Sequence, residues 1–296
     1  MQKFKRMSHG DRIFDYANTV VLIILTLVFF YPIWHCLMAS FSDPGKLLTQ
    51  QSLLIVPNGF SLKGYQTVIG NASIWIGYKN TLIYLAAGTL LNMVLTILGA
   101  YVLSRQHLML KKFLLFFVTL TMYISAGLIP TFLTIKSLGL YNTRFALILP
   151  VAISTYNMIV MRTAFSHVPR ALEESAMIDG ASDLTILVRI LLPVSKATLA
   201  VIVLFYAVMH WNSWFSAAIY LQDRKKFPLQ LYLREILIAN STAVTGEPGD
   251  PLDGLYYLEE LVKYCTIIVS TVPILCCYPF VQKYFVSGVM LGSLKE

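Results

Sequence analysis

The chain has 296 residues, of which 57% are hydrophobic and only 13% are charged, and its mean hydropathy is +0.67. Because soluble domains carry about 25% charged residues, this composition excludes an ordinary soluble domain and predicts a membrane protein. The net charge of +8 does not indicate nucleic-acid binding, because the basic residues lie between apolar runs and no motif supports it. The four cysteines lack metal-ligand spacing and are expected to be small apolar residues: Cys36, Cys265, Cys276 and Cys277.

Six apolar stretches each come close to the ~20 residues that a helix needs to cross a bilayer. The expected transmembrane helices cover residues 18–41, 81–103, 113–133, 145–161, 199–221 and 264–286. The first stretch is too long for a signal peptide and is followed by bulky aromatic residues rather than a small-residue cleavage site, so we expect it to be retained. The sequence therefore predicts an all-α integral membrane protein with six transmembrane helices.

Lysine and arginine are concentrated in the N-terminal segment and in the loops after the second and fourth spans. The positive-inside rule places these three segments, and both termini, in the cytoplasm. The expected organisation is a cytoplasmic segment at 1–17, the first helix at 18–41, an external loop at 42–77 and a five-helix core at 78–286. That core contains a cytoplasmic loop at 166–196 and an external loop at 222–263, and a cytoplasmic tail follows at 287–296.

The cytoplasmic loop contains a charged, amphipathic stretch, EESAMIDGASDLTILVRILLP, between two apolar spans. Pro169 is suited to the first turn of a short helix. Gly180 is a natural helix stop because glycine adopts the left-handed conformation, and Ser182 can cap a second helix. Pro193 is expected to disturb the chain just before the fifth span. The pattern predicts two short helices joined at Gly180, an arrangement that we call the elbow (residues 166–196).

The first helix of the elbow presents acidic side chains, Glu173, Glu174 and Asp179. A helix that merely rests on lipid headgroups usually carries lysine or arginine on its polar face, because the cytoplasmic leaflet is negative. Acidic residues on that surface are better explained by a basic protein partner. Docking of a protein is therefore the favoured interpretation, and an interfacial helix is the alternative.

The elbow resembles the cytoplasmic loop of ABC importer permeases, whose signature is Glu-Ala-Ala, three residues, Gly, nine residues, then Ile-x-Leu-Pro. A serine replaces the first alanine, which is a small-for-small change. The matching positions are Glu174, Ala176, Gly180, Ile190, Leu192 and Pro193, and Ser175 stands where the signature has its first alanine. Segments 78–84, 127–143 and 284–296 resemble the carbohydrate-uptake branch, and within it the maltose-type, MalG-like permeases. Segments 210–215 and 227–237 resemble a narrower group, the LplC-like oligosaccharide permeases of Gram-positive bacteria.

This resemblance implies the type I ABC importer transmembrane fold with cytoplasmic coupling helices, in the cytoplasmic membrane of a Gram-positive bacterium. It implies that the elbow docks on an ATPase, that Glu174 pairs with a basic group there, and that Ile190 and Leu192 anchor the elbow to its own helices. The implied coupling residues are Glu173, Glu174, Ala176, Asp179, Gly180, Ile190, Leu192 and Pro193. The implied partners are a second, homologous permease in a heterodimer, two ATPase subunits and an external solute-binding lipoprotein.

The chain is expected to have no catalytic site and no cofactor or metal of its own, because it contains no glycine loop that could cradle a phosphate. ATP and Mg are expected on the partner ATPase. The apparent spans contain no Asp or Glu, which argues against a proton- or sodium-coupled carrier.

The polar residues of the spans are neutral and would suit a hydroxyl-rich ligand such as a sugar. The candidates for the substrate pathway are Asn92, Tyr156, Asn157, His210, Trp211, Asn212 and Trp214. Aromatic residues also anchor helices at the headgroup level, and a single asparagine often bonds a neighbouring helix. We expect His210 to be an interior histidine with a satisfied hydrogen bond.

Two alternatives remain open. One is an ABC importer for another solute, such as a peptide, glycerol phosphate or a polyamine. The other is a membrane scaffold that only recruits an ATPase. The long external loop at 222–263 is expected to dock the external binding protein, and the alternative is a disordered tether at its turn-rich part, residues 240–254. The two interpretations are compatible, with the segment before residue 240 ordered and the turn-rich part mobile. The residues leave the particular sugar and its chain length unspecified.

Overall fold

The computed structural model describes residues 9–49, 53–105, 108–242 and 253–293, and the regular elements within them are all helices. The chain divides into two compact units, residues 1–71 with 236–271 and residues 72–235 with 272–296. The elements before the elbow are α1 (His9–Ser40), α2 (Pro44–Thr49), α3 (Lys63–Gly70), α4 (Ala72–Ser104), α5 (Lys111–Leu120), α6 (Leu128–Ser137), α7 (Phe145–Ile148), η1 (Leu149–Val151) and α8 (Thr155–Ser166). The elements from the elbow onward are α9 (Arg170–Ile178), α10 (Asp183–Ile186), η2 (Leu187–Leu191), α11 (Leu192–Val194), α12 (Lys196–Trp211), α13 (Trp214–Tyr220), η3 (Arg224–Lys226), α14 (Leu229–Thr242) and α15 (Asp253–Ser293).

Two helices of the described residues are long and apolar enough to cross a membrane, and the number rises to at most four when each of two bent pairs counts as one span. The long helices are α1 and α4, whose most apolar 18-residue windows have mean hydropathies of 2.3 and 1.9. Compared with the predicted spans at 18–41 and 81–103, α1 begins nine residues earlier and ends one residue earlier, and α4 extends beyond its span at both ends. The predicted sixth span, 264–286, lies inside α15, which continues to Ser293. The expected number of six spans is therefore not established by helix length and composition.

The predictions of continuous helices at 113–133, 145–161 and 199–221 are wrong. In the first of these stretches, α5 ends at Leu120 and α6 begins at Leu128, after Gly127 with a φ of 81°. In the second, α7 and η1 meet α8 at a bend of 50°, where the Ser154 side chain caps α8. In the third, α12 ends at Trp211 and α13 begins at Trp214. Left-handed glycines and side-chain caps end helices even inside an apolar stretch.

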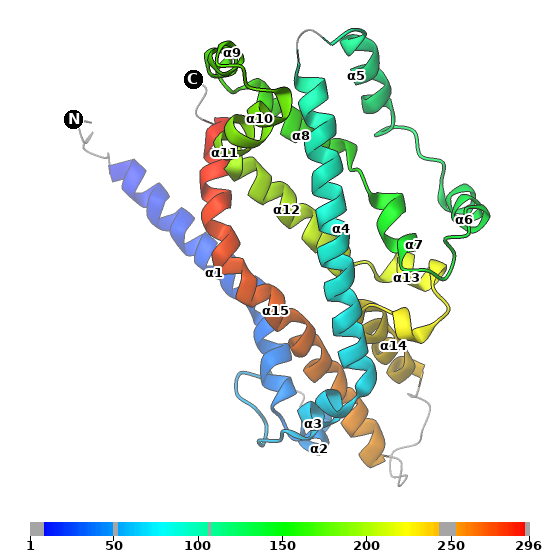
Figure 1. The fold of residues 1–296 in the computed structure, drawn as a ribbon. Coiled ribbons are helices and arrows are strands. Elements are labelled where there is room, and N and C mark those ends of the chain that lie inside the picture. Colours follow the sequence, from blue (N-terminus) through cyan, green and yellow to red (C-terminus); the bar gives the residue numbers. More distant parts are fainter. Residues whose placement is uncertain (1–8, 50–52, 106–107, 243–252, 294–296) are drawn as a thin grey trace. The chain divides into compact units, whose positions relative to one another are not determined.

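The unit that begins at residue 72 is built around α4, which packs against both α8 and α12. One buried cluster joins these three helices to the elbow and contains Ala100, Met161, Phe165, Ile186, Leu187, Leu191, Ile202 and Tyr206. A second cluster joins α7, α13 and α14 near Tyr84. Figure 1 shows α9, α10 and α11 gathered at the end of α4 where Ser104 lies. The elbow is thus seated directly on the helices of this unit.

The unit that contains α1 is held by contacts between its two chain segments. The thiol of Cys265, in α15, is buried and donates a hydrogen bond of 3.3 Å to the carbonyl oxygen of Ser40. A Cβ at Gly64 would lie 2.6 Å from the sulfur of Cys265, so only glycine permits this approach. The apolar side chains of α1 are exposed, as a lipid-facing helix requires. The turn-rich segment expected at 240–254 lies largely outside the described residues.

Candidate functional site

The elbow has the predicted helix–glycine–helix form. α9 ends in a Schellman arrangement, because the N–H of Gly180 donates to Met177 at 3.0 Å and the N–H of Ala181 donates to Ala176 at 2.9 Å. The φ of Gly180 is 79°, a left-handed value that glycine adopts without strain. Pro169 lies one residue outside the helix, at the N-cap, rather than in its first turn. The chain therefore turns sharply after α9 without losing its backbone hydrogen bonds.

The second half of the elbow begins at Ser182, whose side chain accepts a hydrogen bond from the N–H of Thr185 and caps α10. A π-helical turn, η2, follows α10 and ends two residues before Pro193. Proline has no N–H to donate to the preceding turn, and sharp changes of helix direction occur at prolines and at π-turns. The segment from Asp183 to Val194 then meets α12 at a bend of 86°. The disturbance expected at Pro193 is confirmed.

The elbow is attached to the helices beneath it by apolar packing and by polar contacts. Ala176 of α9 packs against the cluster around Ile186 and Leu191, as do Ile190 and Leu192. Tyr101, near the end of α4, donates to the Asp183 side chain at 2.8 Å. Because close-packed side chains transmit displacements, a force on α9 would reach α4, α8 and α12.

The neighbouring carboxylates of α9 have different environments. Glu173 forms a two-point ion pair with Arg105, at the end of α4, and the longer of the two contacts is 3.2 Å. Glu174 and Asp179 are exposed, and the structure shows no ion pair for either among the residues it describes. Glu173 is therefore engaged within the chain, unlike Glu174 and Asp179, and its expected role in coupling stays a prediction. This pair could not be predicted from the sequence, in which only the position of Arg105 at the end of a span is a signal.

The exposed surface of α9 is mixed in character. Ile178 is 86% exposed and Met177 is 50% exposed, next to the carboxylates of Glu174 and Asp179. Large apolar side chains grouped with charges at an exposed helix end are typical of protein interfaces. We call the surface formed by Glu174, Met177, Ile178 and Asp179 the docking surface, after the protein partner that the sequence predicts for it.

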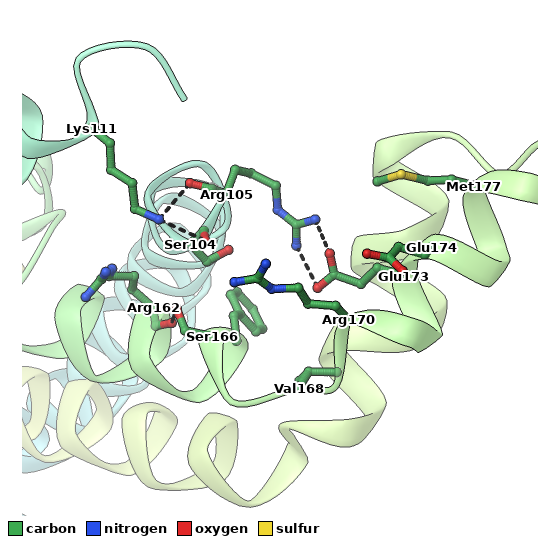
Figure 2. A pocket seen from close by; sticks show the side chains of 11 residues that line it. Ser104, Arg105, Lys111, Arg162, Ser166, Val168, Arg170, Glu173, Glu174 and Met177 are labelled. Atoms are coloured by element: carbon green, nitrogen blue, oxygen red, sulfur yellow. Dashed lines mark hydrogen bonds and ion pairs between the residues drawn. The ribbon is translucent and has the colours of Figure 1, made fainter. Parts of the chain in front are cut away.

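A cavity of about 310 Å³ lies between α9 and the end of α4 (Figure 2). Four basic side chains line it, together with Glu173 and Glu174: Arg105, Lys111, Arg162 and Arg170. Burial lowers the pKa of Lys111, and the nearby charges of Arg162, Arg170 and Arg105 lower it further. The cavity is thus a basic pocket, and sequence reasoning had used these residues only to orient the protein.

The polar candidates in the spans are mostly engaged within the protein. His210 is 1% exposed, and its Nε2 lies 2.7 Å from Oδ1 of Asn92. The Nδ2 amide of Asn92 donates to the carbonyl oxygen of Val151 at 2.5 Å. A Cβ at Gly88 would lie 2.3 Å from the His210 ring. The expected satisfied interior histidine is found. A second group of hydrogen bonds, which was not predicted from the sequence, meets at the Tyr206 hydroxyl. Its oxygen lies 2.7 Å from the hydroxyl of Thr96 and accepts from the N–H of Ser154 at 3.0 Å.

The remaining pathway candidates are not brought together in one site. Tyr156 is 56% exposed, whereas Asn157 is buried. Trp211 is also buried, and its Nε1 has no hydrogen-bond partner among the described residues. Asn212 is exposed and donates to the carbonyl of its own helix at Val208. Trp214 is half-buried beneath the guanidinium of Arg234, at 4.2 Å from the ring centre.

Comparison with known proteins identifies the family to which the chain belongs. Residues 96–289 match the family model described as binding-protein-dependent transport system inner membrane component. The polygalacturonan/rhamnogalacturonan transport system permease protein YtcP of Bacillus subtilis (strain 168) is 40% identical, covering 96% of this chain and 99% of the relative. Protein LplC of the same organism is 37% identical, covering 97% and 96%.

A solved structure agrees with these relatives. The crystal structure of a bacterial ABC transporter involved in the import of the acidic polysaccharide alginate contains a chain that is 33% identical. It superposes with a TM-score of 0.86, covering 95% of this chain and 99% of that chain. These similarities define an integral membrane permease with the type I ABC importer fold. The chain belongs to the family of inner membrane components of binding-protein-dependent transport systems.

Proposed function

We propose that this permease imports an oligosaccharide by alternating access and that a separate ATPase drives it through the elbow. The observation that carries the coupling role is the docking surface of α9. Its Glu174 and Asp179 are exposed beside Met177 and Ile178, while the opposite side of the elbow is packed on the transmembrane helices. Closure of the ATPase pair would push on α9, and the packed cluster would pass that movement to α4, α8 and α12.

In the proposed complex, ATP and Mg bind to the two ATPase subunits, and no nucleotide site is needed on this chain. A second, homologous permease completes a heterodimer, and a solute-binding lipoprotein delivers the cargo from outside. The distribution of lysine and arginine supports a cytoplasmic elbow and cytoplasmic termini. The relatives from Bacillus support the cytoplasmic membrane of a Gram-positive bacterium.

We propose an acidic oligosaccharide as the cargo class. The solved neighbour is involved in the import of an acidic polysaccharide, and a close relative is named for polygalacturonan and rhamnogalacturonan. Arg234 lies over the ring of Trp214, so an exposed guanidinium stands beside an aromatic face. Aromatic faces stack on sugar rings, and guanidinium groups pair with carboxylates. A neutral oligosaccharide is the alternative that the uncharged residues of the spans favour.

Purification of the tagged chain from its native membrane in mild detergent tests the complex. We expect an ATPase, a second six-span permease and a binding lipoprotein to accompany the wild-type chain. We expect the ATPase to be lost when Glu174 and Gly180 are both changed. Recovery of the chain without an ATPase under every nucleotide condition would contradict the proposal. Uptake that survives deletion of the chain would favour a scaffold.

Uptake assays with labelled oligomers test the cargo. We expect oligomers of alginate or polygalacturonan to enter cells that carry the wild-type chain. Arg234→Gln should raise the apparent KM for acidic oligomers, on the order of ten-fold for one lost charged contact. Arg224→Gln is the matched control, because Arg224 already pairs with Glu235 and should change uptake little. Preferential uptake of neutral oligomers would overturn the acidic class and leave sugar import intact.

A further inference from the structure

The basic pocket collects cations from four separate elements. Arg105 follows the last residue of α4, Lys111 begins α5, Arg162 lies in α8 and Arg170 begins α9. Figure 2 shows the guanidinium of Arg170 directed back from α9 toward Ser104 and Arg162, into the space that the other cations surround. Residues this far apart in sequence meet around one cavity of about 310 Å³.

The described residues that line the cavity do not neutralise this charge. Glu173 is committed to Arg105, and the Glu174 side chain is exposed. The ammonium group of Lys111 donates to the carbonyl oxygen of Arg105 at 2.7 Å and so caps the C-terminal end of α4. That carbonyl oxygen carries only the partial negative charge of the helix dipole, not a full charge. Four cations therefore face two carboxylates around the cavity.

Several donors are also left without an acceptor. Nε of Arg105 is buried and has no hydrogen-bond partner among the described residues. Nε of Arg162 donates to the carbonyl oxygen of Leu103 at 3.3 Å, and the two terminal nitrogens of its guanidinium remain available to bind an acceptor in the cavity. Within the part of the chain that the structure describes, Arg170 has no hydrogen bond or ion pair. Buried donors and close cations are costly unless an acceptor with negative charge is present.

We propose that the basic pocket binds a phosphate group, carried either by an anionic phospholipid headgroup or by free phosphate. A tetrahedral oxyanion can accept hydrogen bonds from several directions, which suits a ring of guanidinium groups and an ammonium group. The pocket lies at the end of α4, an apolar helix of 33 residues that is long enough to cross the hydrocarbon core and reach the headgroup region. A phosphate held by Arg170 and Arg105 ties the first turn of α9 to the end of α4.

Arg170→Gln is the direct test, because Arg170 is exposed and has no hydrogen bond or ion pair with another described residue to lose. Arg189→Gln is the matched control, since Arg189 is an exposed cation of the same elbow outside the pocket. Native mass spectrometry of the full chain in detergent measures retained phosphatidylglycerol, with phosphatidylcholine as the uncharged comparison. We expect Arg170→Gln to weaken phosphatidylglycerol binding on the order of ten-fold and Arg189→Gln to leave it unchanged.

A second arm distinguishes the source of the phosphate. The delipidated chain is titrated with inorganic phosphate and followed by phosphorus NMR line broadening, for the same variants. Arg170-dependent binding of phosphatidylglycerol assigns the site to a headgroup, and Arg170-dependent binding of inorganic phosphate alone assigns it to free phosphate. Arg170→Lys should bind more weakly than wild type and more tightly than Arg170→Gln in either case.

Equal binding of both probes by wild type and Arg170→Gln would overturn the inference. Protection of the pocket from solvent only after the ATPase is added would also overturn the inference. An acidic side chain of the ATPase, rather than a phosphate, would then fill the pocket. Neither arm needs cargo or an ATPase to observe phosphate binding. Failure of this inference is therefore separable from failure of the proposed transport function.

Discussion

The elbow and the polar layer between α4 and α12 both contain polar residues that a sequence marks as functional, yet their chemistry differs. On the elbow, Glu174 and Asp179 are exposed without an ion pair in the described structure. In the polar layer, Asn92 and His210 bond each other and are buried. A polar group inside a membrane needs a hydrogen-bond partner within the protein, because lipid supplies none. A polar group at the aqueous face is solvated by water and remains available to bind another molecule. Exposure therefore separates residues that meet a partner from residues that hold helices together.

The largest effect is expected at Glu174. Glu174→Gln removes an exposed charge that is proposed to pair with the ATPase, and the loss of such a partner should weaken assembly by about 3 kcal/mol, roughly 100-fold in affinity. Titration of the purified ATPase onto the permease in detergent measures this. Glu173→Gln is the matched control, because Arg105 already occupies that carboxylate and the loss of ATPase affinity should be smaller. Equal losses for the two variants would mean that exposure does not decide which carboxylate meets the ATPase.

The next effect concerns the polar layer and the close approach that permits it. Gly88→Ala would place a methyl group 2.3 Å from Nε2 of His210, which is buried and bonded to Asn92 and so has little freedom to move. Overpacking of this kind should destabilise the purified chain by about 2 kcal/mol. Thermal unfolding in detergent measures the loss.

Gly99→Ala is the control for that change, because it lies on the same helix. Its methyl group would lie 2.5 Å from the sulfur of Met158, and a methionine side chain can change rotamer more easily than a bonded histidine. A larger loss for Gly99→Ala than for Gly88→Ala would contradict the rigid arrangement assigned to His210.

A third comparison uses two asparagines from the original set of pathway candidates. Asn92→Ala would leave the His210 ring and the Val151 carbonyl without their partner, at a cost of about 1.5 kcal/mol. Asn212→Ala removes a bond to Val208 within the same helix on an exposed residue, so stability should change by less than about 0.5 kcal/mol. If Asn212→Ala raises the KM for cargo without affecting stability, Asn212 retains its place in the pathway.

The elbow could be predicted from sequence because its form depends on local chemistry. A left-handed turn at Gly180, a cap at Ser182 and an interruption at Pro193 each follow from one residue and its immediate neighbours. An all-helical membrane fold was also predictable, because long apolar runs are a local signal. The break between α5 and α6 was not predictable from the same runs. Apolar length alone does not reveal that Gly127 adopts a left-handed conformation inside the stretch.

The contacts within the candidate site were not predictable because they join residues far apart in the chain. Glu173 and Arg105 are 68 residues apart, and Asn92 and His210 are 118 apart. A single sequence marks each of these residues as polar or charged but does not say which helices pack together. The basic pocket was missed for the same reason, since Lys111 and Arg170 become neighbours only when α9 folds back on the end of α4.

The smallest effect is expected for the Arg105–Glu173 pair, which joins the elbow to α4. Both side chains are partly exposed, 21% for Arg105 and 15% for Glu173, so solvent screens part of their attraction. A double-mutant cycle with Arg105→Gln and Glu173→Gln should give a coupling energy of about 1 kcal/mol in thermal or denaturant unfolding. Because the pair lies beneath the docking surface, breaking it should loosen α9 and reduce transport more than it reduces stability. A coupling energy near zero would mean that α9 is held by the packing of Ala176, Ile190 and Leu192 alone, and the elbow would then owe its rigidity to apolar contacts rather than to charge.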